Sequence, residues 1–162
     1  GRVILRKRIN SYGKWVIIKE NKIMEAINHE YYVSLEVAKL LKEAGFDWKV
    51  NHSYPDCESL DNSCSGYMED LSFYHNLNDG KYGGMSAPTL DVAQRWLREV
   101  MDTYIIPQIS DYEVDGCIWE YDYRINIHNI NPMRSLYKYK SYEEAQEAGV
   151  KRALEIILEK GE

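Results

Sequence analysis

Two histidines and two cysteines between residues 52 and 75 have the clearest potential for chemistry in this chain. His52, Cys57, Cys64 and His75 offer the four nitrogen and sulfur donors that a tetrahedral zinc site requires. Zinc ligands usually occur in pairs about two to four residues apart, because one turn then presets two of them. Six residues separate these cysteines. A zinc site therefore competes with a simpler interpretation, unligated loop cysteines and surface histidines.

The same 51–75 loop also contains the residue types of a small metal-dependent or cysteine hydrolase. A cysteine nucleophile needs a histidine base, and the formal combinations draw on Cys57, Cys64, Cys117, His52, His75 and His128. The available acids are Asp56, Glu58, Asp61, Glu69 and Asp70. They lack the regular spacing of a calcium loop, and no sequence context activates a thiol. A solvated acidic loop is favoured, and no cofactor is indicated.

Near residue 134, cations alternate with aromatic rings, as they do on platforms that bind single-stranded nucleic acid. The residues are Arg134, Tyr137, Lys138, Tyr139 and Lys140. An edge strand that lysines protect from aggregation has the same composition. Three N-terminal cations would add phosphate contacts in a nucleic-acid-binding protein: Arg6, Lys7 and Arg8.

Charge divides the chain of 162 residues into two parts. Residues 1–23 contain seven basic residues and one acidic residue, whereas residues 24–162 contain 13 basic and 25 acidic residues. Generic binding to a nucleic-acid backbone needs clustered Lys and Arg, so the larger part is poorly suited to it. The basic segment is either a hairpin or extension on the acidic domain, or a leader of an overextended gene model with translation starting at Met24. We therefore treat 1–23 and 24–162 as separate regions.

Composition indicates an ordinary globular protein. Hydrophobic residues make up 44% of the chain and charged residues 28%. No apolar run approaches the roughly 20 residues of a membrane helix, and no secretory signal is seen. Three cysteines are too few for a disulfide framework, which favours a cytoplasmic location. The 14 tyrosines outnumber the 2 phenylalanines, and tyrosine suits half-buried strands and binding faces.

Three helices can be predicted from their caps and apolar faces. The first helix covers residues 34–44, with Ser34 as its N-cap and Gly45 just beyond its end. The second covers residues 89–100, with Thr89 as its N-cap. Ser141 starts the last helix, which runs to about residue 159. Gly149 in the middle of that helix costs about 1 kcal/mol relative to alanine, a cost that a close helix–sheet contact would explain.

The strongest strand prediction covers residues 116–128, where apolar and polar side chains alternate. One face should pack on the helices and the other should meet water. Further strands are expected at 3–5 and 14–19, which would form a hairpin, and at 67–74, 104–109 and 136–139. Pro107 indicates a sheet edge or a strand end. Residues 51–66 are rich in turn formers and are predicted to be a loop.

The helix starts also resemble those of one protein family. The matching runs are Ser86–Val100, Ser34–Phe46 and residues 141–149, and the resemblance covers the chain from about Met24 onward. The family consists of small proteins without an assigned activity from phages and mobile elements of Bacteroides-type gut bacteria. The resemblance implies a mobile-element setting and points to no site.

Together these patterns predict an α+β domain, with an antiparallel sheet of about four to six strands and three helices packed mainly on one face. The function they favour is that of a non-enzymatic accessory protein acting through protein–protein contacts. The alternatives are a nucleic-acid-binding protein using the basic N-terminal segment and residues 134–140, and the small hydrolase of the 51–75 loop.

Overall fold

The structure is a computed structural model, and it divides the chain into two compact units, Gly1–Glu30 and Tyr31–Glu162. The described residues are 5–9, 15–19, 31–55, 68–81, 84–112 and 119–161. In the first unit, β1 (Leu5–Ile9) and β2 (Trp15–Lys19) pair as an antiparallel hairpin. The unit boundary falls at Glu30, whereas the balance of charge changes near Met24.

The three predicted helices are all present in the second unit. They are α2 (Leu35–Glu43), α3 (Leu90–Val100) and α4 (Tyr142–Gly161). The side chain of Ser34 accepts a hydrogen bond from the first turn of α2, and that of Thr89 does the same for α3. Gly45 has φ +86, the left-handed conformation expected just beyond the end of α2. The capping patterns therefore identified the starts of these helices correctly.

The strands of this unit form two antiparallel sheets of three strands each among the described residues. One sheet has the order β4-β3-β5, and a short 3-10 turn, η1, precedes β5. The other sheet has the order β6-β7-β8. The bounds are β3 Val50–Tyr54, β4 Glu69–His75, η1 Leu77–Asp79, β5 Met85–Ser86, β6 Thr103–Tyr112, β7 Trp119–Ile127 and β8 Met133–Arg134. The predicted α+β class is confirmed.

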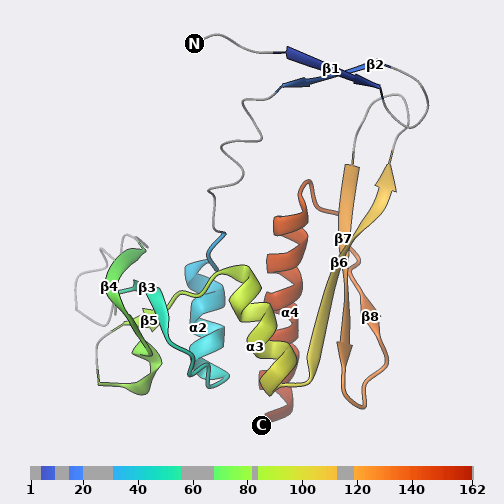
Figure 1. The fold of residues 1–162 in the computed structure, drawn as a ribbon. Coiled ribbons are helices and arrows are strands. Elements are labelled where there is room, and N and C mark those ends of the chain that lie inside the picture. The colour runs from blue at the N-terminus through green and yellow to red at the C-terminus, as the bar shows by residue number, and fades with distance from the viewer. Residues whose placement is uncertain are drawn as a thin grey trace. The chain divides into compact units, whose positions relative to one another are not determined.

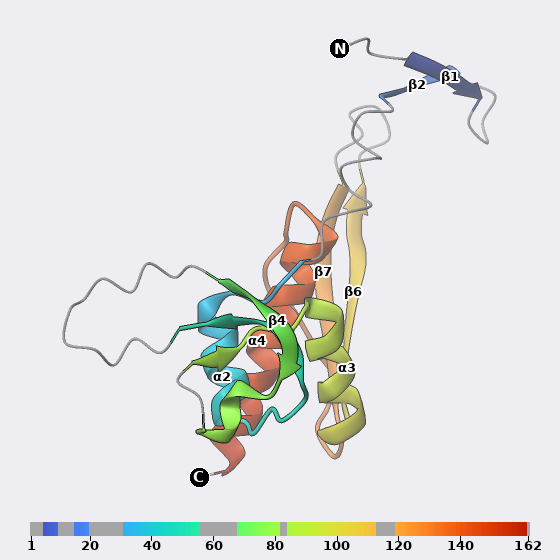
Figure 2. The same cartoon turned by 60° about the vertical axis from the view of Figure 1, so that its left-hand side comes forward.

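The helices lie between the two sheets (Figure 1). Helices α3 and α4 cover one face of β6-β7-β8, and α2 lies toward β4-β3-β5, the sheet nearer the viewer in Figure 2. Trp96 of α3 is fully buried, and its ring meets that of Phe46 edge-on with centroids 5.4 Å apart. The same core contains Tyr123 and Ile125 of β7.

Gly149 permits the close approach of α4 to the sheet. A Cβ atom at this position would lie 2.6 Å from Cγ2 of Ile105 and 3.1 Å from Cγ of Tyr123. Both distances are shorter than ordinary van der Waals contact, so a larger residue would push the helix from the sheet. This close contact explains why the helix contains a residue of poor helix propensity.

Two segments differ from the prediction. Residues 51–54 belong to β3 rather than to a loop, because β3 is the central strand of its sheet and both neighbours pair with it. Residues 136–138 are not a strand. There the hydroxyl of Ser135 accepts a bond from the Tyr137 amide and donates one to the Tyr137 carbonyl, which closes a tight turn. Pairing with β7 resumes at Tyr139, through a bridge to Tyr121.

Candidate interaction surface

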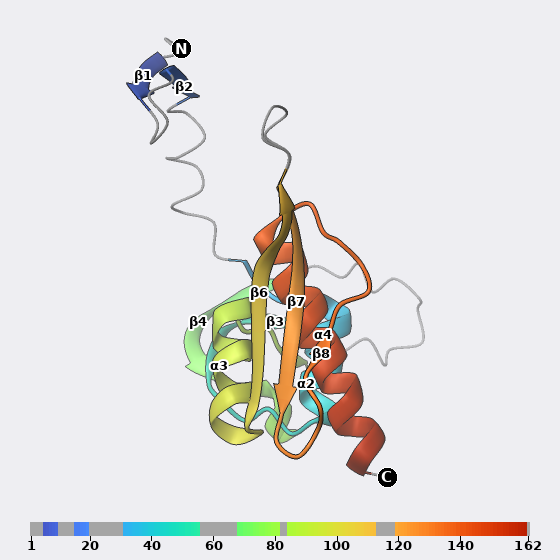
Figure 3. The ribbon, with the colours of Figure 1, turned by 90° about the vertical axis from the view of Figure 1, so that its right-hand side faces the viewer.

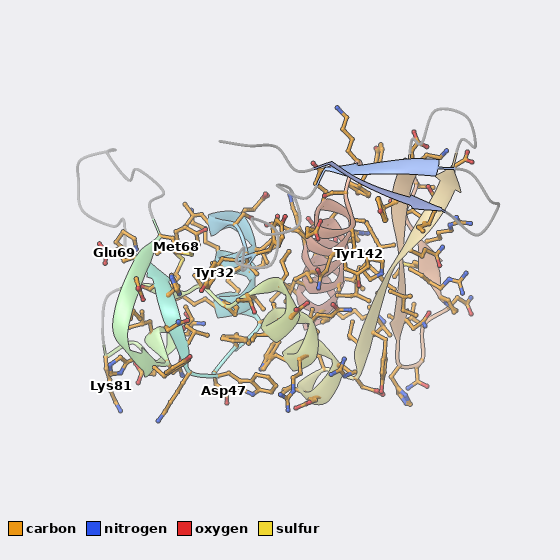
Figure 4. The ribbon with its side chains drawn as sticks, turned by 45° about the horizontal axis from the view of Figure 1, so that its top comes forward. Tyr32, Asp47, Met68, Glu69, Lys81 and Tyr142 are labelled. Carbon is orange, nitrogen blue, oxygen red and sulfur yellow. The ribbon has the colours of Figure 1, made fainter. Side chains whose placement is uncertain are left out.

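The two histidines of the predicted zinc site lie in the sheet β4-β3-β5. His52 is half-buried in β3, its ring stacks on Tyr32 at 4.1 Å between centroids, and its Nδ1 lies 3.0 Å from the side-chain oxygen of Asn51. His75 ends β4 and pairs with Val50. Figure 4 labels Tyr32 beside α2 and Glu69 at the start of β4. These contacts give His52 a packing role in the sheet.

The cysteines Cys57, Cys64 and Cys117 fall outside the described residues, as do the acids Asp56, Glu58 and Asp61. Within the described part of the chain, no group of three or more His, Cys, Asp or Glu side chains could hold a metal ion. Asp70 lies in β4 with a carboxylate oxygen 3.9 Å from Nε2 of His52. The four-ligand zinc site and the cysteine nucleophile stay predictions from the sequence.

The residues of the predicted nucleic-acid platform separate in the structure. Tyr139 is half-buried on the helix side, with its ring 6.0 Å from that of Tyr123. Tyr137 and Lys140 are exposed, and Arg134 and Lys138 form ion pairs with carboxylates. Arg6, Lys7 and Arg8 belong to β1 in the separate N-terminal unit. The described residues 134–140 thus form no continuous row of exposed cations and rings.

What the structure does bring together is the side of β6-β7-β8 that the helices leave uncovered. Figure 3 views the sheet from this side, with the helices behind it. Cross-strand partners share a face, and successive residues alternate between faces. The partners on this side are Tyr104 with Asn126, Ile106 with Arg124, Gln108 with Asp122, and Arg124 with Arg134. We call these residues, together with the partners Asp111 and Glu120 and the adjacent turn Leu136–Lys138, the outer face.

The outer face exposes large apolar side chains. Leu136 is 94% exposed and Tyr137 is 73% exposed, both in the turn that follows β8. On β6, Tyr104 and Ile106 remain more than two-fifths exposed. Scattered exposed hydrophobics are normal on a protein surface. Here two lie on the helix-free side of β6 and two in the turn after β8, so this edge and this turn are the candidate contact regions.

Ion pairs connect the strands across the outer face. Nε and a terminal nitrogen of Arg134 both bond one oxygen of Asp122, with the Nε contact at 2.6 Å. Lys138 lies 2.7 Å from Glu120 and 3.3 Å from Asp111. These hydrogen bonds, that of Glu120 first, raise the pKa of Lys138 above its ordinary value. Both cations are therefore partnered by acids of the same sheet.

Asp122 differs from the other charged residues of the outer face, because it is only 3% exposed although it lies on the side of the sheet that no helix covers. Its second carboxylate oxygen is buried and has no hydrogen-bond partner among the described residues. A buried carboxylate is costly unless it is paired. Arg134 supplies that pairing, and this contact fixes the edge strand β8 to β7.

Nothing in the local sequence marks Tyr104, Ile106, Arg124 or Leu136 as functional residues. Residues 104–106 are apolar without interruption, so alternation gave no sign of which of them would be buried. Leu136 was assigned to a strand that the turn at Ser135 prevents. Pro107 was the useful signal, since β6 is an edge strand of its described sheet and proline lacks the N–H that a further strand would need.

Comparisons of the chain with known protein families, with curated proteins and with solved structures find no match. None of the helices in the described ranges is both long enough and apolar enough to span a bilayer. Function therefore has to be argued from the geometry of the outer face.

Proposed function

We propose that this chain is a non-enzymatic accessory protein that acts through protein–protein contacts, with the outer face as its contact surface. On the resemblance of its helix starts alone, we propose a phage or mobile element of Bacteroides-type gut bacteria as the setting of this role. The observation that carries the proposal is the exposure of Tyr104 and Ile106 on the helix-free side of β6, together with that of Leu136 and Tyr137 in the turn after β8. Aromatic and apolar side chains surrounded by polar groups are the usual composition of such interfaces.

The structure also supports protein rather than nucleic acid as the partner of this face. Two of its cations, Arg134 and Lys138, are held by acids. Asp111, Glu120 and Asp122 would in addition repel a phosphate backbone. Because Arg134 and Lys138 are paired with acids, binding at the outer face gains more free energy from burying apolar side chains than from releasing counterions of a nucleic acid.

Affinity capture with paired variants tests the proposal. The full chain is immobilised as wild type, as the double variant Ile106→Arg/Leu136→Asp, and as Tyr74→Arg. Tyr74 is 67% exposed in the other sheet, so it serves as the matched control. A protein retained by wild type and by Tyr74→Arg, but not by the double variant, is the expected result. Equal retention by all three forms, or no retained protein, contradicts the proposal, provided that the thermal unfolding midpoints agree.

The hairpin of β1 and β2 supports a second candidate, nucleic-acid binding by the N-terminal unit. Arg6, Lys7 and Arg8 are consecutive in β1, and a two-stranded antiparallel ribbon has the dimensions that a DNA major groove admits. The test is a salt titration of binding to duplex DNA and to single-stranded RNA. Substitution of the three cations by Gln in the full chain should weaken binding and reduce its salt dependence. Absence of binding by the wild type eliminates this candidate.

A further inference from the structure

The charges of the outer face balance as a set but not locally. Arg124, Arg134 and Lys138 oppose Asp111, Glu120 and Asp122, so the sum is zero. At one end of the face, Lys138 pairs with both Asp111 and Glu120. At the other end, Arg124 and Arg134 are direct cross-strand partners, and Asp122 bonds only Arg134. The face is thus acidic at one end and basic at the other.

Arg124 is the cation of the outer face that forms no ion pair among the described residues. Its side chain is exposed. Like charges directly opposite each other destabilise a sheet, and Asp122 relieves this repulsion from the Arg134 side only. A further negative charge placed over Arg124 would therefore be attracted by both guanidinium groups.

The surroundings of Arg124 show what kind of molecule would supply that charge. Its cross-strand partner on β6 is Ile106, and Tyr104 lies one step further along the same face. Both are substantially exposed. A guanidinium beside exposed aromatic and aliphatic side chains is the composition of an interface hot spot, where covering the apolar groups strengthens the charge-assisted bond. Glu120 and Asp111 at the far end disfavour a polyanion of uniform charge.

We infer that the outer face binds a polypeptide segment carrying an Asp or Glu whose carboxylate pairs with Arg124, with apolar side chains next to it that cover Tyr104 and Ile106. This partner assignment rests on the proposed function and specifies it. The planar guanidinium can accept a carboxylate through two parallel hydrogen bonds, which gives the contact both strength and direction.

Selection from a random-peptide display library tests the assignment. The baits are the full chain as wild type, as Arg124→Glu, and as Arg98→Glu. Arg98 is an exposed cation of α3 and serves as the matched control for a change of charge. Peptides enriched on wild type and on Arg98→Glu should contain Asp or Glu beside apolar residues. Those enriched on Arg124→Glu should contain Lys or Arg instead.

The selected peptides are then synthesised, and their affinities are measured by fluorescence anisotropy. We expect binding to weaken by about tenfold or more for Arg124→Gln and for the peptide with its acid changed to the amide. If Ile106→Arg abolishes binding of the selected peptides but their sequences show no enrichment in Asp or Glu, the partner assignment is overturned and the proposed function stays intact. Peptides unaffected by Ile106→Arg, or no enrichment at all, overturn both.

Two other occupants are outcomes of the same set of measurements. Sedimentation of the wild type alone would show a dimer if the face bound a second copy, and dissociation of that dimer by Arg124→Glu would overturn the peptide assignment. A single-stranded oligonucleotide that binds the wild type and is lost with Arg124→Glu would overturn it in favour of nucleic acid.

Discussion

Ile105 and Ile106 are neighbours in β6, and they illustrate the difference between the two faces of its sheet. Ile105 is 3% exposed and packs against α4, whereas Ile106 is 43% exposed beside Arg124. The inner face is formed by tight apolar contacts with helices. On the outer face, ion pairs secure the strands while apolar groups stay accessible. The proposed contact surface therefore lies on the opposite side of the strands from the core.

The largest expected effect compares these two isoleucines directly. Ile105→Ala should lower the free energy of unfolding by about 2–5 kcal/mol, because it removes a buried side chain and leaves a cavity. Ile106→Ala should change it by about 0.5 kcal/mol or less. Urea unfolding monitored by tryptophan fluorescence measures both. A similar loss for the two variants would show that the outer face is covered in the folded protein.

At Gly149, the packing of the inner face can be disrupted by adding a methyl group rather than by removing a side chain. Gly149→Ala should lower the free energy of unfolding by up to about 2 kcal/mol, because overpacking costs about 1–3 kcal/mol and alanine returns about 1 kcal/mol of helix propensity. The same change in an Ile105→Ala background should cost less, since the closest atom, Cγ2 of Ile105, is gone. Equal costs in both backgrounds would contradict the close packing described here.

The ion pairs of the outer face can be ranked by the burial of their acids. Arg134→Leu should lower the free energy of unfolding by about 1–2 kcal/mol, since it leaves the buried carboxylate of Asp122 without a donor. Lys138→Ala removes two exposed ion pairs and should lower the free energy of unfolding much less. Chemical denaturation in low and high salt separates them, because salt screens the exposed pairs more strongly. A larger loss for Lys138→Ala would reverse this ranking.

The smallest expected effect is a pH dependence of stability caused by Tyr123 on the inner face. Burial, followed by the nearby Tyr139, raises the pKa of Tyr123 above its ordinary value near 10.0. The unfolded phenol therefore ionises first, so this contribution to stability is complete below about pH 10 and is lost as the pH rises through the folded pKa. Stability measured between about pH 9 and 11 should fall less steeply for Tyr123→Phe. An identical pH slope in the variant would exclude Tyr123 as a source of alkaline unfolding.

The helices could be predicted because their signals are local. Ser34, Thr89 and Ser141 cap free backbone amides within three residues of themselves, whatever the rest of the chain does. Alternation along β7 was equally informative, since its apolar residues, including the buried Tyr123 and Ile125, face the helices.

The candidate surface could not be predicted in the same way. Tyr104, Ile105 and Ile106 are all apolar, so only the packing of α4 decides which of them is buried. Asn51-His52-Ser53-Tyr54 contains the polar residues of a loop, yet pairing with strands on both sides makes it a central strand. In both places, partners distant in the sequence outweigh the local preference.

The sequence by itself determined the α+β class, the helix starts, the β7 alternation and the division of charge between the N-terminal segment and the rest. Each of these follows from residue type or from spacing over a few positions. Only the tertiary structure decided that Gly149 admits Ile105, that Asp122 is buried beside Arg134, and that no acid of the described residues pairs with Arg124. These depend on which side chains of different elements come within a few ångströms of one another, and no local pattern encodes that.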